Sequence, residues 1–153
     1  MELTVDVSQT VPGETVSVNV KGPVRLPDGF SHGKKAAAAD VSFTGSLCRE
    51  SGVFQTGRFI IEGSLTAEIP AVCALCLKDI RWTVDCGIRE FYSREPGDID
   101  EWPAADNILD LTQAFAANIL TALPMKLVCS EGCKGLCPAC GKDRNNDNCS
   151  CNE

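Results

Sequence analysis

The sequence predicts an α+β fold: a mostly antiparallel β-sheet, arranged as a barrel or a sandwich, with one amphipathic helix and a C-terminal tail built around cysteines. Two patterns predict the sheet and the helix. Apolar residues alternate with polar ones through much of the first ninety residues, and they recur at helical spacing after residue 110. The tail is indicated by six of the ten cysteines, which lie within the last 25 residues.

The expected strands are stretches in which every second residue is apolar. Residues 3–7 form the first such stretch, and Pro12-Gly13 is a turn that separates it from the next. The expected strands lie within residues 1–20, 41–45, 59–69 and 80–91. Residues 21–40 begin with Gly22-Pro23 and are expected to form a loop, with a short helical turn or further loop at residues 34–39.

One helix is expected at residues 111–123. Its apolar face comprises Leu111, Phe115, Ile119 and Leu123, which recur at helical spacing. Asp110 as the N-cap and Gln113 three residues later resemble a capping box at its start. Pro124 is expected to end the helix, because proline lacks the N–H that helical hydrogen bonding requires.

Eight cysteines have spacings typical of tetrahedral thiolate metal sites. A C-x2-C loop directs two sulfurs to one point about 2.3 Å from a shared ion. We group them into two four-thiolate sites, a first of Cys73, Cys76, Cys129 and Cys133 and a second of Cys137, Cys140, Cys149 and Cys151. In the alternative grouping, the six tail cysteines compete for one ion and the mid-chain pair stays free.

The sequence thus predicts a zinc-knuckle tail at residues 126–153, packed on a β-rich domain at residues 1–125. Zinc, as one or two structural ions, is the expected metal for four thiolates. Iron is less favoured, because paired rubredoxin-type loops place glycine after the second cysteine and Leu77 follows Cys76 here. A redox dithiol at Cys73 and Cys76 is a further alternative.

No catalytic constellation is recognisable, and we expect a protein that is not an enzyme. His32 is the only histidine, and it is expected to be an exposed bystander in a glycine-bounded loop. Cys48 and Cys86 stand apart from the pairs and are expected to be small buried hydrophobes. A closed four-thiolate site leaves no coordination position open for a substrate.

The formal net charge of −7 is unevenly distributed. Residues 90–110 carry seven acids and one base and are expected to form a solvated loop, whereas residues 126–144 carry four bases and two acids. This distribution argues against a strong phosphate-binding surface. The chain shows neither a signal-peptide pattern nor an apolar run that would span a membrane, and we expect it in the reducing cytoplasm.

Three segments carry a resemblance to a known family. Cys73-Ala74-Leu75-Cys76-Leu77 follows an extended segment, and Asp110-Leu111-Thr112 opens a helix that ends in Leu123-Pro124-Met125. The most specific segment runs from Cys133 to Gly141 and is followed by Cys149-Ser150-Cys151. Over roughly residues 41–151, the chain therefore resembles the bacterial YceD family, the large ribosomal RNA subunit accumulation proteins.

The resemblance implies a cytoplasmic, non-enzymatic accessory factor for the accumulation of large-subunit ribosomal RNA and for ribosome assembly. It implies a ribosomal protein, a large-subunit rRNA precursor or an RNA-processing enzyme as partner, with no membrane and no small-molecule substrate. We expect Lys134, Lys142 and Arg144 in the tail to make the partner contacts. The alternative function is a zinc-ribbon protein that binds RNA or DNA directly.

Overall fold

The computed structural model describes residues 3–27, 38–51 and 57–151. The elements, in chain order, are β1 (Thr4–Asp6), β2 (Thr15–Arg25), β3 (Ala38–Arg49), β4 (Phe59–Val72), β5 (Asp79–Ser93), β6 (Glu101–Pro103), β7 (Ile108–Asp110) and α1 (Thr112–Ala122). His32 and residues 34–37 of the alanine-rich run lie outside the described residues.

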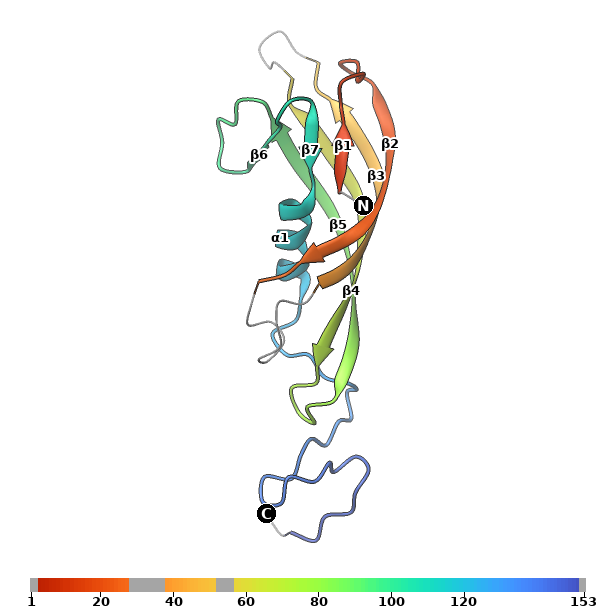
Figure 1. Cartoon of the computed structure of the whole chain (residues 1–153), viewed down its shortest axis with the longest axis vertical. Helices are drawn as coiled ribbons and strands as arrows, with labels where there is room; N and C mark the ends of the chain where they lie inside the picture. Colours follow the sequence, from red (N-terminus) through yellow and green to blue (C-terminus); the bar gives the residue numbers. More distant parts are fainter. Residues whose placement is uncertain (1–2, 28–37, 52–56, 152–153) are drawn as a thin grey trace.

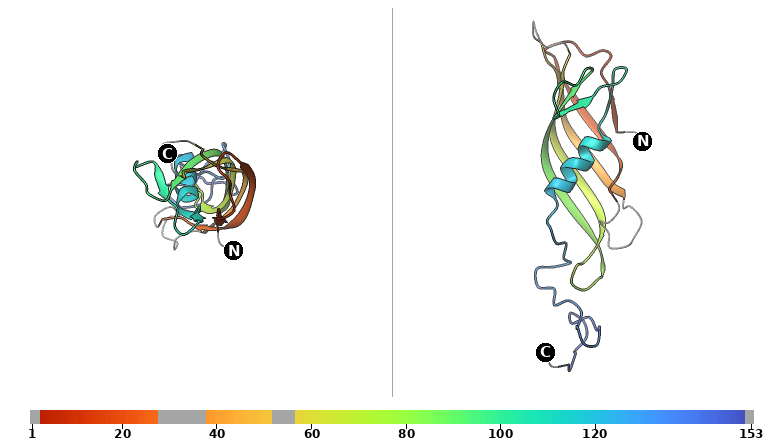
Figure 2. Two further views of the ribbon diagram at one scale, coloured as in Figure 1. Left: turned by 90° about the horizontal axis from the view of Figure 1, so that it is seen from above. Right: turned by 90° about the vertical axis from the view of Figure 1, so that its left-hand side faces the viewer.

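A five-stranded sheet in the order β2-β3-β4-β5-β6 forms the body of the molecule. Strands β2 to β5 pair antiparallel in chain order, whereas β6 pairs parallel with the end of β5. The sheet curls as a half-barrel around α1, and the tail continues past the turn between β4 and β5 at one end of the long axis (Figures 1 and 2). The predicted α+β class and mostly antiparallel sheet are confirmed, and the arrangement is a half-barrel with one parallel pair.

The hydrophobic core lies between the concave face of the sheet and α1. Strand β4 shows the alternation most clearly, with fully buried side chains at Phe59, Ile61, Leu65, Ala67 and Ile69. Helix α1 buries Ala114, Phe115 and Ile119 against this face. The ring centroids of Phe43 on β3 and Phe115 lie 5.3 Å apart. The predicted apolar faces of these strands and of the helix are therefore confirmed.

Two glycines face each other on the paired strands β3 and β4, beneath this aromatic pair. Gly45 pairs with Gly63, and the ring of Phe43 lies over both positions. A Cβ atom on Gly45 would lie 2.6 Å from Phe43 Cζ, and one on Gly63 would lie 2.9 Å from Phe43 Cε2. The missing side chains thus provide the space in which the Phe43 ring meets the helix.

Two expectations about loops are wrong. Strand β2 includes Gly22 and Pro23, because it lies at the edge of the five-stranded sheet, where the missing N–H of proline is tolerated. The acidic segment at residues 90–110 is not one loop, since it contains β6, β7 and the end of β5. Strand β7 pairs with β1 near the start of the chain, and no local sequence pattern predicts this pairing.

Helix α1 begins one residue later than expected, with Leu111 instead of Asp110 as the N-cap. Strand pairing extends to this point, because the Leu111 N–H donates to the Leu3 carbonyl oxygen at 2.8 Å. The Asp110 carboxylate still accepts the N–H of Thr112 at 2.9 Å. No helix in the described part of the chain is long and apolar enough to cross a lipid bilayer.

Candidate metal centres

The first cysteine tetrad joins the β4–β5 turn to the segment that follows α1. Cys73 and Cys76 lie in that turn and are buried. The Cys73 sulfur lies 3.8 Å from that of Cys133, and the Cys76 sulfur lies 3.8 Å from that of Cys129. All four sulfurs lie within 4.8 Å of one another. The structure thus brings together residues that are more than fifty positions apart in the chain.

The second tetrad is built from the tail alone. The Cys149 sulfur lies 3.3 Å from that of Cys137 and 3.4 Å from that of Cys140. Cys151 completes a set whose sulfurs all lie within 4.8 Å of one another. Cys137 is buried, whereas Cys140 and Cys151 are exposed, so this site lies nearer the surface than the first. The tetrads match the two sets predicted from the spacing and not the alternative with a free mid-chain pair.

The spacing of the sulfurs fits a tetrahedral metal ion. Four sulfurs at about 2.3 Å from a zinc ion are about 3.8 Å from one another. The measured separations of 3.3–3.8 Å come close to that geometry and far exceed the roughly 2.05 Å of a disulfide bond. The donor set and its geometry therefore suit a thiophilic divalent cation at each tetrad.

The two C-x2-C loops make the same pattern of backbone hydrogen bonds. In the first, the Cys73 N–H donates to the Lys78 carbonyl oxygen and the Leu77 N–H donates to that of Cys73, at 2.9 and 3.0 Å. In the second loop, the Cys137 N–H donates to the Lys142 carbonyl oxygen, and the Gly141 N–H donates to the Cys137 carbonyl oxygen, both at 2.8 Å. Each loop is also flanked by an antiparallel bridge between the residue before its first cysteine and the residue after its lysine. These bridges are Val72–Asp79 and Leu136–Asp143.

This repeat was missed from the sequence, although the pattern Cys-x-x-Cys-x-Lys-Asp occurs twice. Gly141 and Leu77 occupy the same position in it and have positive φ angles of 73° and 59°. The only sequence argument against iron is that Leu77 occupies the position after the second cysteine, where rubredoxin-type loops have glycine. Since Leu77 adopts the same turn, the loop conformation does not separate zinc from iron.

The sulfurs of the first tetrad titrate unlike isolated thiols. Burial raises the pKa of Cys73, but N–H groups, including those of Cys129 and Leu75, outweigh this effect and lower the pKa to about 6. The Lys78 N–H lowers the pKa of Cys76, but burial and the neighbouring sulfurs together raise it to about 12. Without a cation, this tetrad therefore favours a partly protonated state.

The second tetrad shows the same division. N–H groups of Cys140 and Ala139 lower the pKa of Cys137 to about 6. Contacts with Cys149 and Cys140 raise the pKa of Cys151 to about 12. Four thiolates so close together repel one another, and a bound divalent cation would offset that repulsion.

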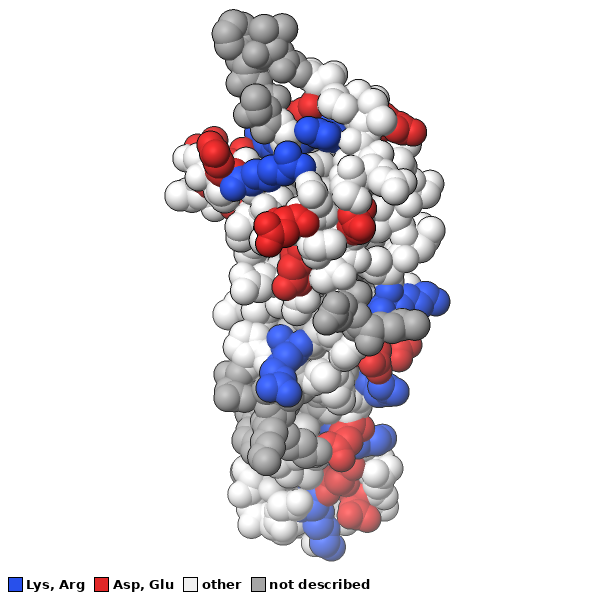
Figure 3. All heavy atoms as spheres, turned by 45° about the horizontal axis from the view of Figure 1, so that its top comes forward, with Lys and Arg blue, Asp and Glu red and all other residues white. Residues whose placement is uncertain are grey.

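The tail basic residues lie around the second C-x2-C loop. Lys134 and Lys142 are exposed, and Arg144 is half-buried with its N–H donating to the Gly135 carbonyl oxygen at 2.9 Å. On the face shown in Figure 3, acidic and basic side chains are interspersed along the molecule, and neither sign forms a continuous stripe. Such a face does not form a strong phosphate-binding surface by itself.

The two remaining cysteines lie in the sheet, away from both tetrads. Cys48 on β3 and Cys86 on β5 are half-buried. Burial raises the pKa of Cys86, and the charge of Asp85 adds to that effect. Cys86 packs against the core, as expected of a small hydrophobe, whereas neither cysteine is fully buried.

One comparison with known proteins identifies a family for this chain. A family model described as "Large ribosomal RNA subunit accumulation protein YceD" matches residues 61–153, which include all eight clustered cysteines. Uncharacterized proteins of Mycobacterium tuberculosis and Mycobacterium bovis are 29% identical over 89 residues, or 54% of this chain and 43% of theirs. The chain thus spans less than half the length of these curated relatives. No solved structure matches the chain significantly.

Proposed function

This chain belongs to the YceD family of large ribosomal RNA subunit accumulation proteins, and we propose that it is a non-enzymatic accessory factor in that process. The observation that carries the proposal is the family match, which covers nearly all of β4, the strands β5 to β7, the helix and both tetrads. The same assignment supports a cytoplasmic location, because ribosomal RNA accumulates where ribosomes are assembled.

We propose that each tetrad binds one structural zinc ion. Four thiolates at tetrahedral spacing suit zinc, and coordination by four protein ligands leaves no open position for a substrate. The bound ion would offset the charge of the four thiolates and hold the two C-x2-C loops in place. Iron in the same ligand set is the alternative, and elemental analysis of the purified protein distinguishes the two metals.

The tail would then act as a preformed recognition element at one end of the molecule. Lys134, Lys142 and Arg144 are its proposed partner contacts. The chain carries a net charge of −7, which favours docking onto a basic ribosomal protein, or onto an RNA-processing enzyme, over binding naked precursor rRNA.

The test is association with large-subunit precursors after charge reversal in the tail. The variant Lys134→Glu/Lys142→Glu/Arg144→Glu is expected to lose co-sedimentation with precursor particles. The matched control, Lys21→Glu/Arg25→Glu/Arg81→Glu, makes the same charge change on the outer face of the sheet and should co-sediment normally. Equal co-sedimentation of both variants would refute the proposed contacts.

Direct binding of nucleic acid makes a different prediction. A protein that binds RNA or DNA by itself loses affinity steeply as salt rises, because phosphate contacts release counterions. We expect little retention of naked rRNA in a filter-binding titration at low salt. Tight, salt-sensitive retention would favour the alternative function of a nucleic-acid-binding zinc ribbon.

A further inference from the structure

Asn145 connects the two cysteine tetrads. Along the chain it lies between Cys140 and Cys149, which belong to the second tetrad. Its side chain nevertheless reaches the first tetrad, where Nδ2 donates to the sulfur of Cys133 at 3.4 Å. Its Oδ1 accepts the N–H of Lys134, the next residue after Cys133, at 2.9 Å.

The neighbouring groups fix the orientation of the Asn145 amide. The Lys134 N–H can only donate, so the atom facing it must be the amide oxygen. The NH2 group then faces the Asp143 carboxylate at 2.7 Å and the Cys133 sulfur, which are both acceptors. Asn145 therefore supplies an N–H donor to a metal-ligand sulfur, a contact that orients ligands and stabilises thiolates.

The position of Asn145 depends on the loop that the second tetrad closes. Asp143 organises this loop by accepting the N–H of Asn145 and the side-chain amide of Asn146, each at 2.9 Å. Both ends of the loop are ligands of the second tetrad, Cys140 and Cys149. A metal ion that draws these sulfurs together would therefore also hold Asn145 against Cys133.

The backbone supports the same coupling. Only residues 134–136 separate Cys133 of the first tetrad from Cys137 of the second. Within that short link, the Leu136 N–H donates to the Leu75 carbonyl oxygen in the first C-x2-C loop, at 3.1 Å. The two tetrads are thus connected by a short link that is itself hydrogen-bonded to the first C-x2-C loop, which gives a contiguous physical route between them.

We propose that Asn145 couples the two tetrads, so that a metal ion in the second tetrad raises the affinity of the first for its own ion. The inference rests on the proposed metal binding and adds to it a dependence between the sites. Coupling of binding free energies is reciprocal, so loading of the first tetrad also favours the second.

The test is a zinc competition titration of the full chain against a chelator of known affinity. Native mass spectrometry counts the bound ions, and mapping of alkylated cysteines identifies which tetrad is protected. Asn145→Ala is expected to weaken zinc binding at the first tetrad by roughly 10- to 100-fold, the usual effect of losing an outer-shell partner. Asn148→Ala is the matched control, because it makes the same change in the same loop and the exposed Asn148 side chain has no hydrogen bond in the described network.

A double-mutant cycle separates coupling from a local effect. Cys149→Ser/Cys151→Ser disables the second tetrad and is expected to weaken the first to a similar degree. Adding Asn145→Ala to that background should change little further, because the loop no longer holds Asn145 in place. Asn145→Asp, which keeps the acceptor but replaces the donor, should weaken the first tetrad at least as much as alanine does.

Two results would overturn the coupling while leaving metal binding intact. The first is an Asn145→Ala variant whose first tetrad binds zinc as tightly as the wild type does. The second is a combined variant in which the fold-losses of zinc affinity caused by Asn145→Ala and by Cys149→Ser/Cys151→Ser simply multiply, as they would for independent sites. The far-ultraviolet circular dichroism of the sheet and the fluorescence of Trp82 and Trp102 report whether each variant is folded. Absence of metal from both tetrads of the wild-type protein would instead refute the proposed zinc sites themselves.

Discussion

At the scale of single residues, the two C-x2-C loops place different side chains in the same strained position. Gly141 adopts a positive φ of 73° and a Cβ added to it would meet no atom within 4 Å, so only its backbone conformation favours glycine. Leu77 adopts a φ of 59° although the residue is 59% exposed. A non-glycine residue in this region costs roughly 1–2 kcal/mol, and the exposed leucine gains little burial in return.

Leu77→Gly should therefore stabilise the metal-loaded protein. The expected gain in the free energy of unfolding is about 0.5–1 kcal/mol, after allowing for the larger conformational entropy of unfolded glycine. Gly141→Ala makes the reverse change at the equivalent position and should destabilise by about 1 kcal/mol. Denaturant unfolding of the loaded proteins measures both effects, and a stabilising Gly141→Ala would contradict the assigned strain.

At the scale of elements, the close approach of β3 and β4 depends on the glycine pair beneath Phe43. A Cβ at Gly45 would also lie 2.8 Å from the Cα of Gly63, within the neighbouring backbone, which cannot move aside easily. Gly45→Ala is expected to destabilise the protein by about 3 kcal/mol, at the upper end of the usual cost of overpacking.

The matched control for this change lies on the next strand. Gly87 of β5 has only the Gly63 carbonyl oxygen near a Cβ position, at 4.0 Å, which is an ordinary contact. Gly87→Ala should be neutral or stabilising by about 0.5 kcal/mol, because alanine loses less entropy on folding. Thermal unfolding compares the two variants, and equal effects would show that β propensity, not space, sets the cost.

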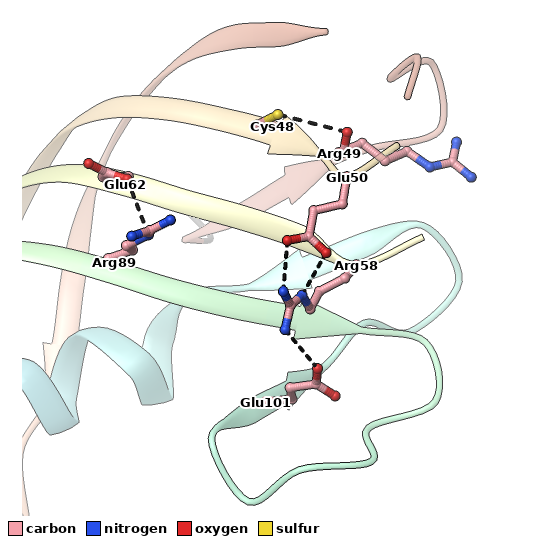
Figure 4. A network of polar contacts seen from close by, with 7 residues as sticks. All are labelled: Cys48, Arg49, Glu50, Arg58, Glu62, Arg89 and Glu101. Carbon is pink, nitrogen blue, oxygen red and sulfur yellow. Dashed lines mark hydrogen bonds and ion pairs between the residues drawn. The ribbon is translucent and has the colours of Figure 1, made fainter. Parts of the chain in front are cut away.

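A charged pair, Glu50 and Arg58, lies just beyond the paired ends of β3 and β4. Arg58 donates from Nε and Nη2 to the Glu50 carboxylate at 2.8 and 2.7 Å, and its Nη1 lies 3.6 Å from Glu101 of β6 (Figure 4). The Arg58 guanidinium also lies 4.7 Å from the centroid of the Phe91 ring. This bidentate contact lowers the pKa of Glu50 below its usual value.

The lowered pKa predicts a pH dependence. A carboxyl group with a depressed folded-state pKa contributes stability above its unfolded-state pKa and loses it as the pH falls through the folded-state value. Glu50→Gln should therefore cost up to about 1 kcal/mol at neutral pH, and the difference from wild type should vanish in acid. Glu68→Gln on the exposed face of β4 is the control. A pH-independent difference would contradict the assignment.

How much of this organisation the sequence predicts depends on the range of the contacts. The strands and the helix face are predictable because burial imposes a local period on the residues. The second cysteine set is predictable because it closes within the tail, whereas the first joins residues more than fifty positions apart and had to be inferred by grouping the remaining cysteine pairs. The pairing of β7 with β1 was missed, and so was the contact of Asn145 with Cys133, since each joins segments whose patterns are uninformative alone. The αL turn at Leu77 was missed because glycine is its usual signal.

At the scale of the whole molecule, the body and the tail are stabilised by different interactions. The body buries an extensive apolar core between the sheet and α1. In the described part of the tail, residues 126–151, only Leu127, Gly135 and Cys137 are buried. So small a core cannot offset the conformational entropy of ordering the segment. The tail is therefore expected to depend on metal for its structure, whereas the body is not.

Removal of the metal should unfold the tail and leave the body folded. After treatment of the full chain with a chelator, we expect rapid hydrogen exchange and protease cleavage within residues 126–151, with protection retained in β2 to β5. Readdition of zinc should restore protection of the tail, because metal binding supplies its folding free energy. The hydrogen bond from the Ala74 N–H to the Leu127 carbonyl oxygen, 2.8 Å long, marks where the loss of protection should begin. A tail that stays protected without metal would show that its contacts with the β4–β5 turn suffice.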